Sequence, residues 1–348
     1  MADVEVAATD SKNVPLRVRA AVIDRPGASP RIGVVDIAEI RPGTTLVRVL
    51  GTALNPLDIS IAAGVVPSVR HEEPYVPGIE CTGVVVESER FVPGELVYAE
   101  RHPSPASPGC FAGYVVVSDD DLIGLPGGVD PVQAVAVGNS GVAAFMSLVE
   151  LAALRNGDSV LILGATGAVG KLAVQIARGY GAGRIVAVGR DAEALAQTLE
   201  LGAHAAVELR PGESGEELSD RLRAAAPSFD VVLDGLFGMP LEAALRVCGP
   251  GARVVNVGNP AGSQITLPAG LLRGRELTVR AFAGYKTPLS RKHAALQWLW
   301  VALADGLLRL DVRVRPLDEL PAAWAEQHQG SPHVKTVIVP GTSPGPVP

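Results

Sequence analysis

Hydrophobic and polar residues follow two different patterns along the chain. Between about residues 15 and 125, short hydrophobic runs such as LRVRAAVID and GVVVESE are separated by turns rich in glycine and proline. Short strands bounded by such turns predict a compact, barrel-like β domain. Only residues 56–63 show the pattern of a helical turn in this part of the chain.

From about residue 130 the pattern changes to alternating strands and helices. Asp130 is a suitable N-cap, and Pro131 suits the first position of a helix. Strands that are apolar throughout then alternate with amphipathic helices, which is typical of a parallel sheet covered on both faces. The strands are expected at residues 159–163, 184–188, 205–209, 229–233, 252–257 and 277–282, and the helices near 168–180, 191–201, 214–226 and 240–247. This order predicts the doubly wound α/β architecture of dinucleotide-binding domains.

The last part of the chain is again rich in β-type sequence. A long amphipathic segment at residues 293–308 is followed by a strand, a helix and a second strand, expected at 310–317, 318–328 and 334–340. We expect this tail to rejoin the first domain, which would then be discontinuous. The predicted division is a catalytic β domain at 15–137 and 308–340, a nucleotide-binding domain at 138–307, and flexible ends at 1–14 and 341–348.

Composition limits the function classes. The 348 residues are 47% hydrophobic and 19% charged, which indicates a folded protein with room for two domains. A net charge of −7 argues against a nucleic-acid-binding protein. The N-terminal residues contain no signal-peptide pattern, and no run of about 18 apolar residues is evident, so we expect a soluble cytoplasmic protein without a membrane span.

The most informative motif is GATGAVG, which joins an apolar strand to an amphipathic helix. Gly167 and Gly170 occupy the second and third positions of a G-x-G-x-x-G pattern, while Ala165 replaces the first glycine and Gly164 precedes it. Glycines let the backbone approach a pyrophosphate, and the helix N-terminus offers free N–H groups. A tight turn without a ligand is the alternative. The predicted phosphate contacts are Ala165, Thr166, Gly167, Ala168 and Val169.

The end of the second strand indicates which dinucleotide is bound. Gly189 and Arg190 stand where an NAD-binding protein carries an acidic residue for the ribose hydroxyls. A small residue leaves room there, and a guanidinium can pair with a 2′-phosphate, so NADP is predicted over NAD. Asp191 could weaken this preference, and an exposed surface role for Arg190 is the alternative. Ligands also lie beyond the carboxyl ends of the other strands, which points to Asn139, Leu236, Val257, Gly258 and Asn259.

These strings resemble the medium-chain dehydrogenase/reductase superfamily, and most closely its zinc-independent quinone oxidoreductase and enoyl reductase branch. The resemblance covers about residues 16–340 and is carried by TALNPLDISIAAG, PYVPGIECTGVVV, GATGAVGKLAVQIARGYGA and FDVVLDGLFG. It implies a GroES-like catalytic domain, a Rossmann domain, an active site between them and, commonly, a homodimer.

The resemblance also predicts that no metal is bound. Where zinc-dependent relatives carry their ligands, this chain has Asn55, Ile79 before Glu80, and Asn139. Isoleucine cannot bind zinc, and neutral amides bind it poorly. Widely spaced Cys81, Cys110 and Cys248 form neither a zinc knot nor a disulfide framework. Cys81 and Cys110 are expected to be buried, unreactive thiols, since no lysine or histidine adjoins them in sequence.

Without a metal ion, reduction of a polarised acceptor is favoured over oxidation of an alcohol. The expected reaction is hydride transfer from NADPH to a quinone or an activated C=C bond, with donors that stabilise the developing oxyanion. Asn55 and Asp58 are the candidate catalytic residues. Asn55 could instead shape the turn before Pro56, and a bracing role is favoured for Asp58.

The proton donor is not evident from the sequence. Related enoyl reductases carry a tyrosine where this chain has Val66, and His71, Tyr75, Tyr285 and Lys286 are alternatives by residue type only. Lys171 could neutralise phosphate or lie on a helix surface. Two other functions stay open: a biosynthetic tailoring reductase with a larger acceptor, and a nucleotide-binding protein that has lost turnover.

Overall fold

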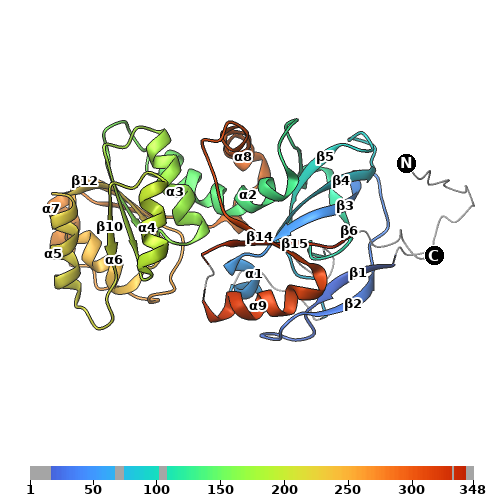
Figure 1. Ribbon diagram of the computed structural model, residues 1–348, viewed down its shortest axis with the longest axis horizontal. Helices are drawn as coiled ribbons and strands as arrows, with labels where there is room; N and C mark the ends of the chain where they lie inside the picture. The colour runs from blue at the N-terminus through green and yellow to red at the C-terminus, as the bar shows by residue number, and fades with distance from the viewer. Residues whose placement is uncertain (1–16, 67–73, 102–107, 331–332, 342–348) are drawn as a thin grey trace, which may run out of the picture.

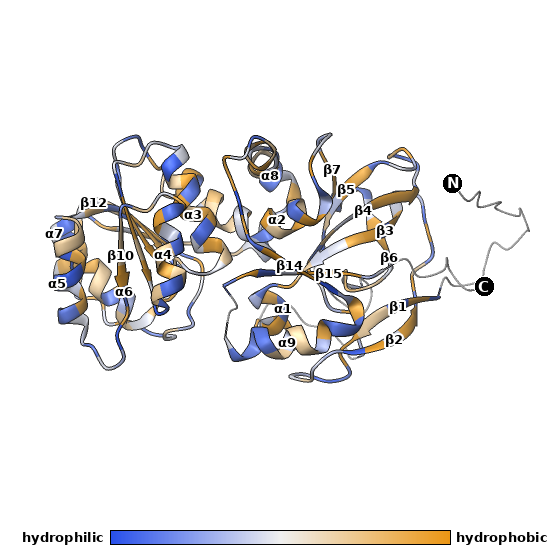
Figure 2. Ribbon diagram, viewed as in Figure 1, coloured by the Kyte–Doolittle hydropathy of each residue, from blue (hydrophilic) through white to orange (hydrophobic). Residues whose placement is uncertain are grey.

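The computed structural model describes residues 17–66, 74–101, 108–330 and 333–341, and it consists of two domains side by side (Figure 1). The predicted flexible ends, apart from Gly341, lie outside the described residues, as does His71. Figure 2 shows hydrophobic residues concentrated in the strands, with hydrophilic residues on the outward faces of the surrounding helices.

The first domain is built on a seven-stranded, largely antiparallel sheet of order β14-β15-β3-β4-β5-β7, with β6 also paired to β3. A separate hairpin, β1-β2, lies beside it. The strands are β1 (Arg17–Val22), β2 (Arg31–Asp36), β3 (Thr44–Ala53), β4 (Glu80–Glu87), β5 (Leu96–Glu100), β6 (Tyr114–Ser118), β7 (Leu122–Gly124), β14 (Val312–Pro316) and β15 (Lys335–Val339). Because β15 pairs with β3, the C-terminal segment joins the sheet of the first domain.

The second domain is a six-stranded parallel sheet of order β10-β9-β8-β11-β12-β13, which confirms the doubly wound architecture. Its strands are β8 (Ser159–Leu163), β9 (Arg184–Gly189), β10 (Ala205–Glu208), β11 (Phe229–Asp234), β12 (Cys248–Asn256) and β13 (Thr278–Ala281). Its helices are α3 (Ala168–Gly179), α4 (Ala192–Glu200), α5 (Gly215–Ala225), α6 (Gly238–Leu245) and α7 (Ala269–Arg275). The short α7 was not expected from the sequence.

Helix α2 (Pro131–Phe145) packs on β3 and β4 of the first domain and on α3 of the second, so the two domains share one core. The expected boundary between residues 137 and 138 therefore falls inside a helix. The remaining elements are α1 (Pro56–Ala62), α8 (Leu289–Ala304), α9 (Leu320–Gln329), a π-helical segment η2 (Met146–Leu151) and the 3₁₀ turns η1 (Asp119–Asp121), η3 (Gly284–Lys286) and η4 (Leu317–Glu319).

Helix α2 and its continuation form one segment, Pro131–Leu151, that is long and apolar enough to cross a membrane. This is not the continuous run of about 18 apolar residues that the sequence was predicted to lack, because polar residues such as Gln133, Asn139 and Glu150 interrupt it. Since 72% of its most hydrophobic window is buried within the protein, packing between the domains accounts for its composition.

Candidate active site

The glycine turn after β8 is tightly folded against the second strand. Gly164 has a φ of +83°, and the N–H groups of Gly164 and Ala165 both donate to the carbonyl of Val188, at 3.0 and 2.9 Å. A Cβ atom on Gly170 would lie 2.4 Å from the Cα atom of Ala165, so only glycine fits there. At Gly167 the nearest atom to such a Cβ is the carbonyl oxygen of Gly164 at 3.8 Å, an ordinary van der Waals distance, so a small side chain would fit there.

Helix α3 begins at this turn without a side-chain cap. Its N-cap is Gly167, whereas α4 and α5 are capped by the side chains of Asp191 and Ser214. The first N–H groups of α3, at Ala168 and Val169, therefore have no side-chain acceptor. Thr166 packs over Gly189, where a Cβ would meet its methyl group at 2.7 Å. This arrangement suits a bound pyrophosphate.

Lys171 does not extend toward this turn. Its ammonium donates to the side chain of Gln197 at 2.9 Å and to the carbonyl of His333 at 2.8 Å. Burial lowers the pKa of Lys171. The residue ties α3 to the C-terminal segment of the first domain, a role that its helical position in the sequence did not indicate.

The end of β9 presents a free positive charge. Arg190 is exposed and makes no ion pair or hydrogen bond to any residue that the structure describes. Asp191 accepts a hydrogen bond from the N–H of Ala194 at 2.7 Å, and its other oxygen lies 3.5 Å from Nε2 of His333. The Ala194 N–H lowers the pKa of Asp191, so this carboxylate is held charged as the cap of α4.

The carboxyl ends of β8, β11 and β12 meet through their backbones. A Cβ on Gly164 would lie 3.3 Å from Leu236, and one on Gly258 would lie 3.1 Å from the carbonyl of Gly235. Asn256 donates to the Asp234 carboxylate at 2.7 Å and to the Gly258 carbonyl at 2.7 Å. These two polar residues, which sequence reasoning missed, hold together the backbone positions predicted to line the nicotinamide site.

The remaining predicted positions at this edge differ in exposure. Val257 follows β12 directly, is partly buried and donates its N–H to the Asp234 carbonyl at 2.8 Å. Asn259 lies two residues further on and is exposed. Its carbonyl accepts a hydrogen bond from the N–H of Gly262 at 3.2 Å.

Asn55 and Asp58 form the start of α1. Asp58 accepts from the N–H of Asn55 at 2.8 Å and from the N–H of Ile79 at 3.1 Å, so it braces the helix against β4. The Asn55 amide donates to the carbonyl of Ala53 at 3.0 Å and to Oε1 of Glu80 at 2.8 Å. Both of its N–H groups are used within the protein, and the donor role expected for Asn55 would require one of these bonds to break.

Lys335 brings a buried positive charge to Asn55. Its ammonium donates to Oδ1 of Asn55 at 2.6 Å and lies 3.3 Å from the hydroxyl of Ser140. Glu80 completes the network, since its Oε2 accepts from the hydroxyl of Tyr98 at 2.8 Å and from the N–H of Asn139 at 2.7 Å. The side-chain amide of Asn139 is partly buried and makes one long contact, 3.5 Å to Asn55, among the described residues.

Burial perturbs every ionisable group of this network. It raises the pKa of Asp58 to about 7, raises the pKa of Glu80 and lowers the pKa of Lys335. The charge of Lys335 acts in the opposite direction on both carboxyls. Neither Lys335 nor Tyr98 was singled out from the sequence, because both lie in ordinary strand patterns.

The positions that match zinc ligands are occupied by groups that do not suit the metal. Asn55 and Asn139 are engaged with each other and with Glu80, and Ile79 packs in a small cluster with Ile61, Val66, Leu57 and Tyr285, which we call the Ile79 cluster. Among the residues that the structure describes, no group of three or more His, Cys, Asp or Glu could hold a metal ion. That the protein needs no metal stays a prediction.

The other candidate donors lie in different places. Tyr75 is buried in a core with Leu54, Phe111 and Trp324. Tyr285 reaches the Ile79 cluster from the second domain, and the ammonium of Lys286 lies 5.9 Å from its ring centre. The three cysteines are buried and free, and burial raises the pKa of Cys110 and that of Cys248, the latter to about 12.

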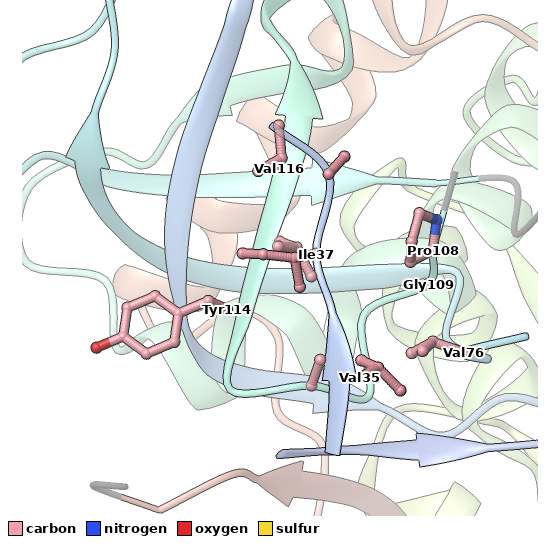
Figure 3. A pocket seen from close by; sticks show the side chains of 10 residues that line it. Val35, Ile37, Val76, Pro108, Gly109, Tyr114 and Val116 are labelled. Carbon is pink, nitrogen blue, oxygen red and sulfur yellow. The ribbon is translucent and has the colours of Figure 1, made fainter. Parts of the chain in front are cut away.

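An apolar hollow elsewhere in the first domain is not a candidate site. It lies between β2 and β6 and is lined by side chains including Val35, Ile37, Val76 and Val116 (Figure 3). Its volume is about 10 Å³, which is too small for any acceptor and barely admits one water molecule.

Two known family models match separate parts of the chain. The model of the alcohol dehydrogenase GroES-like domain matches residues 41–129. The model of the zinc-binding dehydrogenase family matches residues 168–300. The second family is described as zinc-binding, whereas this chain has Asn55, Ile79 and Asn139 at the positions that match zinc ligands.

Individual relatives are reductases and polyketide synthases. The quinone oxidoreductase of Sus scrofa is 28% identical over 257 residues, which are 72% of this chain and 76% of that protein. A component of the phenolphthiocerol/phthiocerol polyketide synthase of Mycobacterium tuberculosis is 28% identical over 331 residues, 92% of this chain. The chain spans only 15% of the length of that synthase component.

A solved structure shares the whole fold. A probable oxidoreductase from Mycobacterium abscessus superposes with a TM-score of 0.79 at 25% identity, covering 94% of this chain and 100% of the other. The fold and the nucleotide-type turn thus define a protein that pairs a GroES-like domain with a Rossmann domain. The chain belongs to the medium-chain dehydrogenase/reductase superfamily, in its quinone oxidoreductase-like branch, which confirms the resemblance found in the sequence.

Proposed function

We propose that this protein is an NADPH-dependent reductase that needs no metal ion and reduces a quinone or the activated C=C bond of an α,β-unsaturated carbonyl compound. NADPH, when bound, supplies the hydride. The observation that carries the proposal is the start of α3 at Gly167, which has no side-chain cap and lies beside the end of β9. Thr166 packs there on Gly189, and the next residue, Arg190, is exposed.

The residues of the second domain fit each part of the dinucleotide. The N–H groups at the start of α3 would bind the pyrophosphate, and the Arg190 guanidinium would pair with the 2′-phosphate of the adenosine ribose. Asp191 is occupied as the α4 cap, so it is poorly placed to bind ribose hydroxyls. The nicotinamide half would lie against Asn139 and the carboxyl edge of the sheet, at Leu236, Val257, Gly258 and Asn259.

The acceptor would meet the Ile79 cluster and the amide of Asn139. Ile61, Val66 and Ile79 are themselves buried, so the acceptor would lie against the partly exposed Leu57 and Tyr285 at the edge of the cluster. An apolar edge of this kind suits a planar, uncharged molecule such as a quinone or an enone. The Asn139 amide retains hydrogen-bonding capacity among the described residues, so it can donate to the acceptor oxygen. Asp58 and Glu80 position Asn55 and the N–H of Asn139 rather than touching the acceptor.

A specialised biosynthetic acceptor is a second candidate. Similarity over 92% of this chain to a polyketide synthase component supports it. A panel that compares simple quinones, small enones and enoyl thioesters distinguishes the two, because a tailoring enzyme would reduce only the larger thioesters. The proposal also includes a cytoplasmic homodimer, which fractionation and gel filtration would check.

Substitution of Arg190 tests the cofactor assignment. Arg190→Ala should raise the KM for NADPH about tenfold or more while leaving the KM for NADH nearly unchanged, because a hydrogen-bonded ion pair to the 2′-phosphate is lost. Arg273→Ala, an exposed arginine on α7, is the matched control. An equal effect of Arg190→Ala on both nucleotides would contradict the NADP assignment, and no nucleotide oxidation across the whole panel would contradict the reductase itself.

A further inference from the structure

Lys335 places a buried ammonium group in the centre of the candidate site. It is the first residue of β15, and only 6% of its surface is exposed. The 2.6 Å bond to Oδ1 of Asn55 is short, as expected for a charged donor. Burial of an ammonium is costly unless its charge is used or compensated, so the residue requires an explanation.

The side-chain amide of Asn55 lies between the Lys335 ammonium and Asn139. Asn139 belongs to α2, the helix that packs on both domains. The N–H of Phe282 donates to the carbonyl of Asn256 at 2.9 Å, so the segment after β13 begins at the carboxyl end of β12. A Cβ on Gly284 in this segment would lie 3.4 Å from Oδ1 of Asn139. The Nδ2 atom of Asn139 lies 3.5 Å from Oδ1 of Asn55, which also accepts the hydrogen bond from the Lys335 ammonium.

The charges around this point are otherwise negative. Asp58 is 2% exposed and Glu80 is fully buried, and the charge of Lys335 acts on both. Without Lys335, a negative charge that develops on an acceptor at Asn139 would face two buried carboxyls and no compensating cation of this network. In a low-dielectric interior, the electrostatic energy of that developing charge differs greatly with and without the Lys335 ammonium.

We propose that the Lys335 ammonium, acting through the amides of Asn55 and Asn139, stabilises the negative charge that develops on the acceptor oxygen during reduction. The inference rests on the proposed reductase function and makes Lys335 a positioning and electrostatic residue. The acceptor carbon gains the hydride with its two electrons, and the electron pair displaced from the double bond moves to the oxygen. One proton, from water or an acidic side chain, completes the reduction, while Lys335 keeps its own protons throughout.

A purely structural role is the competing explanation. Lys335 could serve only as the counter-ion that allows Glu80 to be buried and charged. The single variant Lys335→Met would not separate the two, because it leaves the Glu80 carboxylate unpaired and destabilises the protein. The double variant Lys335→Met/Glu80→Gln removes these two charges together, so it relieves the unpaired charge of Glu80 without restoring the positive potential. Asp58 remains in both variants, with its N–H donors at Asn55 and Ile79.

The experiment compares this double variant with Glu80→Gln alone. With a quinone or enone that the wild type reduces, the double variant should show a kcat about 30-fold to 100-fold below that of Glu80→Gln, because one electrostatic contribution to the oxyanion is lost. The Kd for NADPH and the melting temperature should be similar in the two variants. Lys292→Met/Glu100→Gln is the matched control, since Lys292 and Glu100 form a second buried ion pair. Glu100 lies opposite Glu80 across β4 and β5, but among the described residues neither member of this pair bonds to Asn55 or Asn139.

A binding measurement supplies a readout other than turnover. The probe is 4-nitrophenol in the presence of NADP⁺, because its ionised form absorbs visible light and resembles the oxygen anion of the reduction. Lys335 should favour the ionised form of the bound probe. The ratio of bound phenolate to phenol should therefore be about tenfold higher in Glu80→Gln than in the double variant. This is less than the loss of rate that follows removal of an oriented hydrogen-bond donor to an oxyanion.

Four results would overturn the inference. If the double variant turns over as fast as Glu80→Gln, or ionises bound nitrophenol equally, Lys335 is only a counter-ion. If the double variant loses NADPH binding as well, Lys335 serves the cofactor. If Lys292→Met/Glu100→Gln loses as much activity, the effect belongs to any buried ion pair. A wild-type protein that oxidises no NADPH is a different failure, because it removes the proposed function itself, and the Lys335 inference with it.

Discussion

At the scale of single residues, the source of the proton depends on a contact between distant parts of the chain. Val66 cannot donate, but it lies in the Ile79 cluster, against which Tyr285 packs from the second domain. Tyr285 is therefore the tyrosine that the fold packs beside Val66. Tyr75 was the other tyrosine considered as a proton donor. It is buried in a separate core with Trp324 and does not belong to the Ile79 cluster.

Tyr285→Phe should separate the two proposed acceptor classes. Reduction of an enone leaves a basic enolate that needs an acid, so kcat should fall about 10²-fold. Quinone reduction leaves a weakly basic oxygen that takes its proton from water, and its kcat should be nearly unchanged. Steady-state rates with both acceptors measure this, with Tyr114→Phe, a partly buried tyrosine on β6, as the control. Identical losses with both acceptors would remove Tyr285 as the proton donor.

At the scale of elements, helix α3 performs two tasks, one at its N-terminus and one along its side. Its glycine N-cap leaves the first N–H groups without a side-chain cap, while Lys171 and Gln175 on its side bind the C-terminal part of the first domain. The Gln175 side chain exchanges two hydrogen bonds with the backbone of Arg309, at 2.9 and 2.9 Å. The helix that would bind the pyrophosphate is thus also one that connects the domains.

Two alanine substitutions in this turn should have opposite effects. Gly167 has a φ of −81° and no atom nearer than 3.8 Å to an added Cβ, so Gly167→Ala should fold normally. Its methyl group would occupy the space proposed for phosphate, and the Kd for NADPH should rise about tenfold, the effect of removing roughly one charged hydrogen bond. Fluorescence titration and thermal unfolding measure the two effects.

Gly170→Ala should instead destabilise the protein. The added Cβ would lie 2.4 Å from both the carbonyl oxygen of Gly164 and the Cα atom of Ala165, and overpacking of this kind costs about 1–3 kcal/mol. The melting temperature should fall clearly below that of Gly167→Ala. A normal melting temperature for Gly170→Ala would show that the turn is less closely packed than the structure describes.

At the scale of the whole molecule, buried acids make stability depend on pH. Burial raises the pKa of Asp58 and of Glu100 to about 7 each. Because their pKa values are lower in the unfolded chain, the folded state binds more protons than the unfolded state between about pH 4 and pH 7. Their contribution to stability is therefore present at low pH and is lost as the pH rises through about 7.

Urea unfolding between pH 5 and pH 8 should show this loss. The free energy of unfolding should decrease across that range, and Glu100→Gln should make the decrease shallower, because one of the carboxyls with a raised pKa is gone. The comparison concerns the slope with pH, since Glu100→Gln also leaves Lys292 without its carboxylate. A variant with an unchanged slope would show that Glu100 does not titrate in this range.

Much of the fold could be predicted from local patterns. The apolar strands of the second domain and the helices between them occur close to the expected residues, since strands buried on both faces must be apolar throughout. The glycine turn was evident because its geometry requires residues without a Cβ, as at Gly170. Helix α7 was missed because its seven residues contain too few apolar positions to show a periodicity.

The candidate site depended on contacts that no local pattern contains. Lys335 bonds to Asn55, 280 residues away, and Lys171 bonds to the backbone of His333, 162 residues away. The sequence by itself determined the two kinds of domain, the phosphate-type turn and the residues at the zinc-ligand positions, because each depends on residue types at short spacing. Only the tertiary structure decided which charges are buried together, since a lysine at the start of an ordinary strand acquires its role from the groups that the fold packs around it.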